Sequence, residues 1–298
     1  MLSAIFATLF GLATGSFLSV CIYRIPRSRE DFPELLLPID GSAPPEESLA
    51  EGPPHQVIQI HNPPRSFCPS CNQTLRWWHN IPLLSWLFLR GRCGFCRAPI
   101  SARYPLVEFL GGLTAYLSVT IFGVTPTAAL IFIFCCALIV ISFIDYDFYI
   151  IPNVISLPGT VLGVGIAVVN QYLHIFSYPV VPGLLDSVWG LLAGAGFLYL
   201  VSEGYMRLRK REGLGMGDVK LLAMTGVVFG APGALFTIFI GSLLGAVIGI
   251  LFVVCGGRRF SHPLPFGPSL ALATYLYIFL GGDALGFLNG GHVVPPLM

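Results

Sequence analysis

Two aspartates in this chain lie where apolar stretches begin or end, and together they could carry out acid–base chemistry. Asp145 follows the apolar run 128–144, and Asp218 lies in the segment 214–220, Leu-Gly-Met-Gly-Asp-Val-Lys, just before a second apolar run begins at Leu221. An ionisable group at membrane depth usually has a function. Two carboxylates that share one proton can act as an aspartyl protease, because the ionised one activates water while the protonated one polarises the scissile carbonyl.

The residues beside Asp218 strengthen this interpretation. Gly215 and Gly217 place no bulky side chain on its N-terminal side, so another helix or a peptide backbone can approach closely. The simpler alternative for either aspartate alone is a solvated carboxylate or, for Asp218, a pairing with the lysine two positions later. Asp147 is a rival of Asp145, but it lies farther beyond the apolar run and should be more hydrated, so we favour Asp145.

Four cysteines form a second group whose spacing suggests chemistry. Cys68 and Cys71 make one Cys-x-x-Cys pair, Cys93 and Cys96 make another, and 21 residues separate the two pairs. This pattern matches a zinc ribbon with four thiolate ligands, with a spacer slightly longer than usual. Four thiolates leave zinc no open position, so we expect a structural metal. Disulfides or free thiols are the alternatives.

The composition places these groups in a polytopic membrane protein. Of the 298 residues, 55% are hydrophobic and only 10% are charged, whereas soluble domains carry about 25% charged residues. We expect an all-α fold with about eight transmembrane helices and a small cytoplasmic zinc-ribbon-like insertion, because eight apolar spans approach the roughly 20 residues that cross a bilayer. The spans are 2–23, 104–123, 127–145, 152–173, 184–206, 216–232, 235–256 and 265–288.

The basic residues predict the orientation of these spans. The first span has no basic residues before it, which predicts an uncleaved first helix. Threading the chain with both termini outside gives the inner segments 24–103, 146–151, 207–215 and 257–264. Every Lys and Arg falls in or beside one of these segments, as the positive-inside rule requires. Asp145 and Asp218 then lie at cytoplasmic helix ends at similar depth. A cytoplasmic location also argues against disulfides between the paired cysteines.

Three further features of the N-terminal part allow weaker expectations. Residues 28–64 are rich in Pro, Glu and Ser and are expected to be a flexible insertion. The segment 77–88, between the cysteine pairs, contains three tryptophans and is too short to span; it either lies in the membrane interface or packs around the zinc knuckles. Glu108, about one turn into the second span, should pair with a partner or line a site, and it is our only candidate for the lining of a cofactor site.

A series of motifs extends along nearly the whole chain. They are the stretches 15–20 (GSFLSV), 23–26 (YRIP), 64–66 (PRS), 80–87 (NIPLLSWL), 103–108 (RYPLVE), 143–147 (FIDYD), 151–153 (IPN), 215–223 (GMGDVKLLA) and 265–268 (PFGP). Taken together, they resemble the type IV prepilin peptidases, which are bifunctional leader peptidases and N-methyltransferases. The Gly-x-Gly-Asp motif alone would be less specific, because presenilin-like and signal-peptide-peptidase-like proteases also carry one.

The resemblance implies an activity and its partners. It implies that Asp145 and Asp218 are the catalytic pair of a protease in the bacterial inner membrane. The implied substrates are type IV prepilins or the pseudopilins of type II secretion systems, whose basic leader stays in the cytoplasm and is cut after a Gly. The new N-terminal residue, commonly Phe, is then methylated with S-adenosylmethionine. The sequence contains no Rossmann-type glycine fingerprint that would mark where this methyl donor binds.

The expected division of labour follows from the same resemblance. We expect residues 1–103, the first helix and the zinc region, to be associated with methylation, and residues 104–298 to form a peptidase region of seven helices. Membrane lipid is an expected partner, nucleic acid is not, and the sequence assigns no oligomeric state. The alternatives are a peptidase without methyltransferase activity, an ion-coupled transporter that uses the two aspartates as proton or cation ligands, and a membrane scaffold whose zinc region docks a partner.

Overall fold

The computed structural model describes most of the chain as helices. The described residues are 1–28, 66–68, 70–71, 73–181, 183–210, 215–256 and 265–288. Their contacts divide the chain into a smaller unit, residues 8–113, and a larger unit, residues 1–7 with 114–298. The expected flexible insertion lies outside the described residues from position 29 to 64, and so do the inner-loop residues Arg211, Arg258 and Arg259.

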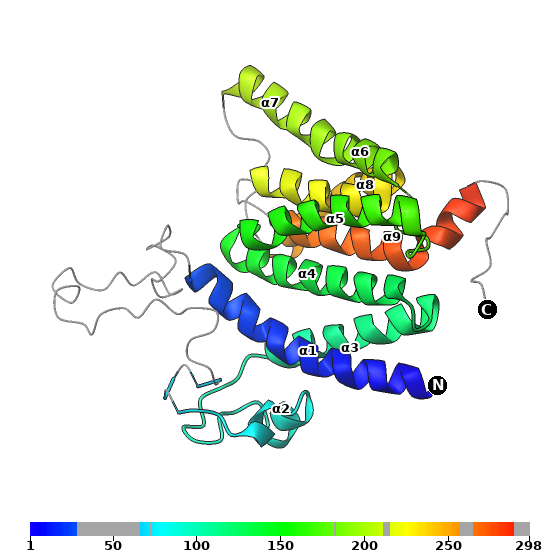
Figure 1. Cartoon of the computed structure of the whole chain (residues 1–298). Coiled ribbons are helices and arrows are strands. Elements are labelled where there is room, and N and C mark those ends of the chain that lie inside the picture. Colours follow the sequence, from blue (N-terminus) through cyan, green and yellow to red (C-terminus); the bar gives the residue numbers. More distant parts are fainter. Residues whose placement is uncertain are drawn as a thin grey trace. The chain divides into compact units, whose positions relative to one another are not determined.

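The long helices follow the expected spans (Figure 1). They are α1 (Leu2–Arg27), α3 (Arg103–Phe122), α4 (Pro126–Phe148), α5 (Asn153–Leu173), α6 (Leu184–Leu191) continued through the π-helical segment η4 (Leu192–Gly196) into α7 (Phe197–Arg209), α8 (Met216–Gly256) and α9 (Gly267–Leu288). In the described part of the chain, six helical stretches are long and apolar enough to cross a membrane, and a shorter apolar stretch lies at the start of α9. The chain is therefore an all-α, multi-pass membrane protein.

Helix α8 contains both the sixth and the seventh expected spans. As one straight helix, its 41 residues would be about 60 Å long, twice the hydrocarbon thickness of a bilayer. Gly230 interrupts it with φ 71° and ψ −173°, a conformation that glycine adopts readily. Beyond this break, the second half of α8 runs back alongside α9, so the element accounts for two crossings. Three contacts show this arrangement. Gly233 lies against Tyr277, Gly241 lies against Leu270, and Gly245 lies against Phe266 at the start of α9.

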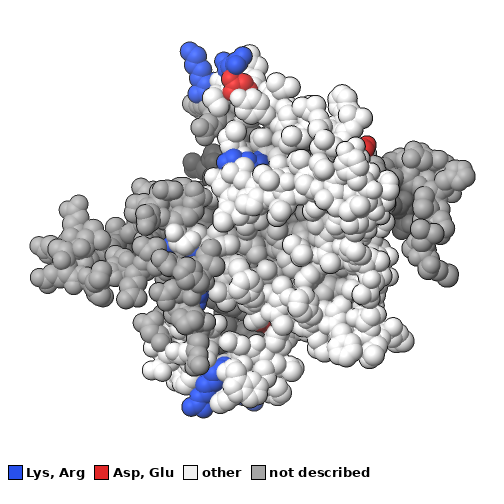
Figure 2. All heavy atoms as spheres, in the orientation of Figure 1, with Lys and Arg blue, Asp and Glu red and all other residues white. Residues whose placement is uncertain are grey.

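The larger unit has a core formed by α4, α5, α8 and α9. Fully buried aliphatic side chains from α4 and α8 meet there, with Phe134 and Phe229 packed edge to face at a centroid distance of 4.8 Å. Many other apolar side chains stay exposed, as expected where lipid replaces water. On the face drawn in Figure 2, described charged residues are few and most of the helical surface is uncharged.

The smaller unit contains most of α1, the cysteine segments and the first turns of α3. Each Cys-x-x-Cys pair lies in a tight loop closed by an isolated β-bridge, Phe67 with Thr74 and Arg92 with Pro99. Between the loops lie the short helices η3 (Trp77–Asn80) and α2 (Leu84–Phe88). The side chains of Trp77 and Phe88 are 75% and 81% exposed, which favours the interfacial interpretation of this segment over packing around the knuckles.

Candidate active site and metal centre

Asp145 lies in the last turn of α4 and contacts the backbone of another helix. Its side chain is only 6% exposed. The N–H of Gly267, the first residue of α9, donates a hydrogen bond to its Oδ2 at 2.9 Å. A Cβ at position 267 would lie 2.7 Å from the same oxygen, so any residue larger than glycine would displace the carboxyl group of Asp145. Helix α4 ends directly afterwards, because Tyr149 takes a left-handed conformation and its N–H caps the carbonyl of Asp145.

Asp218 lies in the first turn of α8, and its side chain is 8% exposed. The carboxyl groups of Asp218 and Asp145 are close enough to interact electrostatically, although 73 residues separate them in the sequence. Gly217 packs against Ile151 in the link between α4 and α5, where a Cβ would come within 3.0 Å of the isoleucine Cβ. The glycine before Asp218 therefore leaves room for the side chain of Ile151, where the sequence predicted a helix or a peptide backbone.

Lys220 has another partner, and Asp147 is exposed. Nζ of Lys220 donates a hydrogen bond at 2.8 Å to Oδ1 of Asn153, and among the described residues it forms no salt bridge with Asp218. This bond ties the start of α5 to the start of α8. Asp147 is exposed, as expected for the more hydrated rival of Asp145. The pairing with lysine therefore does not account for Asp218.

This arrangement can perform acid–base chemistry. Two carboxyl groups that are buried and interact with each other are suited to hold one proton between them. An ionised carboxylate can then take a proton from water while the protonated one donates to a carbonyl oxygen. Such a pair titrates as a unit, and it needs no nucleophilic Ser or Cys.

The four paired cysteines gather in the smaller unit. Their Sγ atoms all lie within 4.8 Å of one another, and those of Cys68 and Cys96 are 3.9 Å apart. Tetrahedral zinc with Zn–S bonds of about 2.3 Å requires sulfur atoms about 3.8 Å apart, so the four thiols fit this metal. The backbone N–H groups of Cys96 and Phe95 lower the pKa of the Cys93 thiol to about 7, whereas burial and the neighbouring thiols raise the pKa of the Cys71 thiol to about 11. All four cysteines are free, so the disulfide alternative does not hold in this structure.

Glu108 has a partner that the sequence could not identify. Its side chain is 8% exposed, and its Oε2 accepts a hydrogen bond at 2.8 Å from the backbone N–H of Leu83. This bond joins α3 to the loop between η3 and α2, inside the smaller unit. The carboxyl group therefore belongs with the cysteine region, where it borders a cavity.

The sequence identified the two aspartates but not the residues that contact Asp145 and Lys220. Gly267 and Asn153 had appeared only as members of the short motifs Pro-Phe-Gly-Pro and Ile-Pro-Asn, without a role. The structure gives them contacts, with Asp145 and with Lys220 respectively. The signal that could have found them is the position of both motifs next to predicted cytoplasmic ends of helices.

Comparisons with known proteins match both parts of the chain. Residues 9–122 match the family model described as Bacterial Peptidase A24 N-terminal domain, and residues 132–250 match the Type IV leader peptidase family. No solved structure matches the chain.

Curated relatives match along almost their whole length. A prepilin leader peptidase/N-methyltransferase of Burkholderia pseudomallei (strain 1026b) is 36% identical, with 96% of this chain and 88% of the relative covered. Proteins of the same description from Aeromonas hydrophila and Xanthomonas campestris pv. campestris are 37% and 36% identical. The matches cover 93% and 94% of this chain and 90% and 92% of the relatives. With its buried aspartates and its four-cysteine cluster, the chain belongs to the prepilin leader peptidase/N-methyltransferase family.

Proposed function

We propose that this protein removes the basic leader of type IV prepilins, or of type II secretion pseudopilins, by aspartyl protease chemistry. The observation that carries the proposal is the meeting of Asp145 and Asp218 as two buried, interacting carboxyl groups. One carboxylate takes a proton from the attacking water and the other donates to the scissile carbonyl oxygen. Membership of the family supports this activity over the transporter and scaffold alternatives.

The second half of the proposed function is N-methylation of the new N-terminal residue, commonly Phe. The names of the relatives support this activity, and S-adenosylmethionine is the proposed methyl donor. When bound, it supplies a methyl group attached to a positively charged sulfur. We assign residues 1–103 to methylation and residues 104–298 to cleavage; the compact units divide the chain near the same place, between positions 113 and 114.

The proposed metal is a structural zinc ion held by Cys68, Cys71, Cys93 and Cys96. The spacing of the four Sγ atoms supports this assignment. Four thiolates complete a tetrahedral zinc site, so the ion stabilises the fold of the two cysteine loops and takes no part in cleavage.

The proposed location is the bacterial inner membrane, with both chain termini outside and the active site at the cytoplasmic face. The placement of all 16 Lys and Arg residues in or beside the inner segments supports this orientation. The substrate then keeps its basic leader in the cytoplasm while its apolar helix enters the bilayer, and the scissile bond lies at the depth of the two aspartates.

The test is mass spectrometry of a co-expressed prepilin. With the wild-type protein we expect loss of the leader and a gain of one methyl group. With Asp218→Asn we expect the intact prepilin, because a carboxamide cannot share the proton. Asp147→Asn, which changes an exposed carboxylate nearby, should still cut. An intact prepilin with the wild type, across several pilins, would overturn the peptidase assignment. A cut but unmethylated product would leave a peptidase alone.

A further inference from the structure

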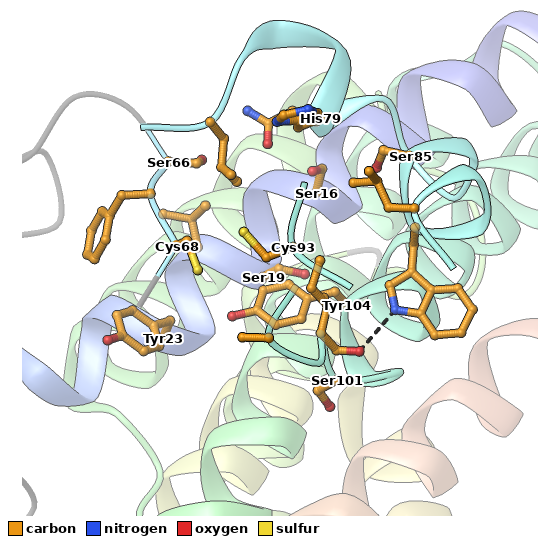
Figure 3. A pocket seen from close by; sticks show the side chains of 18 of the residues that line it. Ser16, Ser19, Tyr23, Ser66, Cys68, His79, Ser85, Cys93, Ser101 and Tyr104 are labelled. Carbon is orange, nitrogen blue, oxygen red and sulfur yellow. Dashed lines mark hydrogen bonds between the residues drawn. The ribbon is translucent and has the colours of Figure 1, made fainter. Parts of the chain in front are cut away.

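The smaller unit contains a cavity that the cleavage chemistry does not use. Its volume is about 360 Å³, within the range of small-molecule sites. Figure 3 shows Ser16, Ser19 and Tyr23 reaching into it from α1, and Tyr104 from the start of α3. Cys68 and Cys93 of the proposed zinc cluster form part of its wall. The cavity therefore depends on the fold of the cysteine loops.

The lining combines flat aromatic groups with polar groups that lack a full set of partners. Trp86 and Tyr104 supply aromatic faces, and the indole N–H of Trp86 is fixed by a 3.1 Å hydrogen bond to the carbonyl of Ile100. Nδ1 of His79 is buried and has no hydrogen-bond partner among the described residues. A buried polar atom without a partner is costly.

One wall of the cavity carries a negative group and a strained turn. The Glu108 carboxyl group borders the cavity and receives the N–H of Leu83. Leu83 has φ 59° and ψ −48°, and the N–H of Leu84 bonds to the carbonyl of Pro82, which makes a rare γ-turn with positive φ. A bulky residue in this conformation persists only where its surroundings hold it, and such strain gathers at ligand sites.

We infer that this cavity, bordered by Glu108, Trp86, Tyr104 and His79, binds the methyl donor S-adenosylmethionine. The inference rests on the proposed methyltransferase function and gives that function a site. The Glu108 carboxylate attracts the positively charged sulfonium, and the aromatic faces receive the adenine ring. In the transfer, the substrate amine attacks the methyl carbon. A C–N bond forms, the C–S bond breaks with its electron pair staying on sulfur, and the amine releases its proton to water.

The charge of the donor gives a sharp test of this assignment. S-Adenosylhomocysteine has the same adenosine and amino-acid groups but lacks the methyl group, so its sulfur is neutral. We would measure binding of both compounds to the purified full-length protein by calorimetry. Glu108→Gln keeps an oxygen that accepts from the N–H of Leu83 but removes the negative charge. We expect it to weaken S-adenosylmethionine binding about tenfold and to change S-adenosylhomocysteine binding by less than about twofold.

Two controls separate the site from the fold. Glu203→Gln makes the same change at a carboxylate of α7 that pairs with Arg207, and it should alter neither affinity. Prepilin cleavage by Glu108→Gln should match that of the wild type, which reports an intact fold. Equal weakening of both compounds, or no weakening of either, would overturn the inference.

A second measurement decides the matter if Glu108→Gln does not fold. Ultraviolet cross-linking of radiolabelled S-adenosylmethionine to the wild-type protein should label a peptide within residues 16–24 or 66–108, which line the cavity. Labelling only within residues 114–298 would overturn the site while leaving methylation in place. A protein that cuts prepilin but binds no S-adenosylmethionine would lose both the site and the methyltransferase function, and the peptidase would remain.

Discussion

The two compact units hold their reactive groups in different ways. In the larger unit, Asp145 and Asp218 are brought together by the packing of helices whose residues are far apart in the sequence. In the smaller unit, two short loops hold the four thiols around the proposed metal, and a loop N–H, that of Leu83, binds the Glu108 carboxyl group of α3. A membrane helix bundle satisfies its backbone internally and positions charged groups by packing. A small loop-rich unit with little core relies on cross-links instead.

The largest expected effect comes from removing one aspartate. Asp145→Asn and Asp218→Asn should each reduce prepilin cleavage at least about a hundredfold, because the carboxamide can neither act as a base nor share the proton. The zinc content and the binding of S-adenosylmethionine should stay at wild-type levels if the two units work independently. Cleavage rates by mass spectrometry, with metal analysis of the same preparations, check this. Substantial cleavage by either variant would remove that residue from the site.

The converse experiment acts on the cysteine cluster. Cys68→Ser should lower the zinc-to-protein ratio, because serine is a poor ligand for zinc in place of a thiolate. We expect methylation to fall roughly ten- to a hundredfold while cleavage changes by less than about twofold. The exposed Phe88→Ala in the same unit should leave the zinc ratio unchanged. An unchanged zinc ratio in Cys68→Ser would contradict the metal site, and an equal loss of both activities would contradict the division between the units.

A smaller effect is expected where α9 meets Asp145. In Gly267→Ala, the new Cβ would lie 2.7 Å from Oδ2 of Asp145, so the carboxyl group must move. A shift of this kind should slow cleavage about tenfold. Gly165→Ala in α5, where no atom lies within 4 Å of the new Cβ, should cleave at the wild-type rate. If the two variants behave alike, the contact with Gly267 does not position Asp145.

The smallest expected effect concerns the tie between α5 and α8. Lys220→Met removes the 2.8 Å hydrogen bond to Asn153, so the first turn of α8 is held less firmly. We expect cleavage to fall about threefold, the effect of roughly one hydrogen bond. Lys220→Gln, which can still donate to the Asn153 oxygen, should recover most of the rate. A glutamine variant no better than the methionine variant would show that the charge of Lys220, and not this bond, is what matters.

Much of the fold could be predicted because the bilayer restricts the choices. Long apolar spans must form helices, and the positions of Lys and Arg predict on which side each helix ends. The sixth and seventh spans were predicted to meet between positions 232 and 235, whereas the structure breaks α8 at Gly230, two residues inside the predicted sixth span. The spacing of the four cysteines in the sequence predicted that they cluster, because the spacing of ligands along a chain reflects the geometry of the metal they bind.

The sequence by itself determined the helices, their expected orientation and the residue types able to do chemistry, because hydrophobicity, charge and ligand spacing are local properties. Only the tertiary structure decided three hydrogen bonds. The N–H of Gly267 donates to Asp145, Lys220 donates to Asn153 and not to Asp218, and the N–H of Leu83 donates to Glu108. These contacts join positions 122, 67 and 25 residues apart. They depend on how helices and loops pack in space, and hydrophobic patterning along the chain does not specify which backbone group reaches a given carboxyl group.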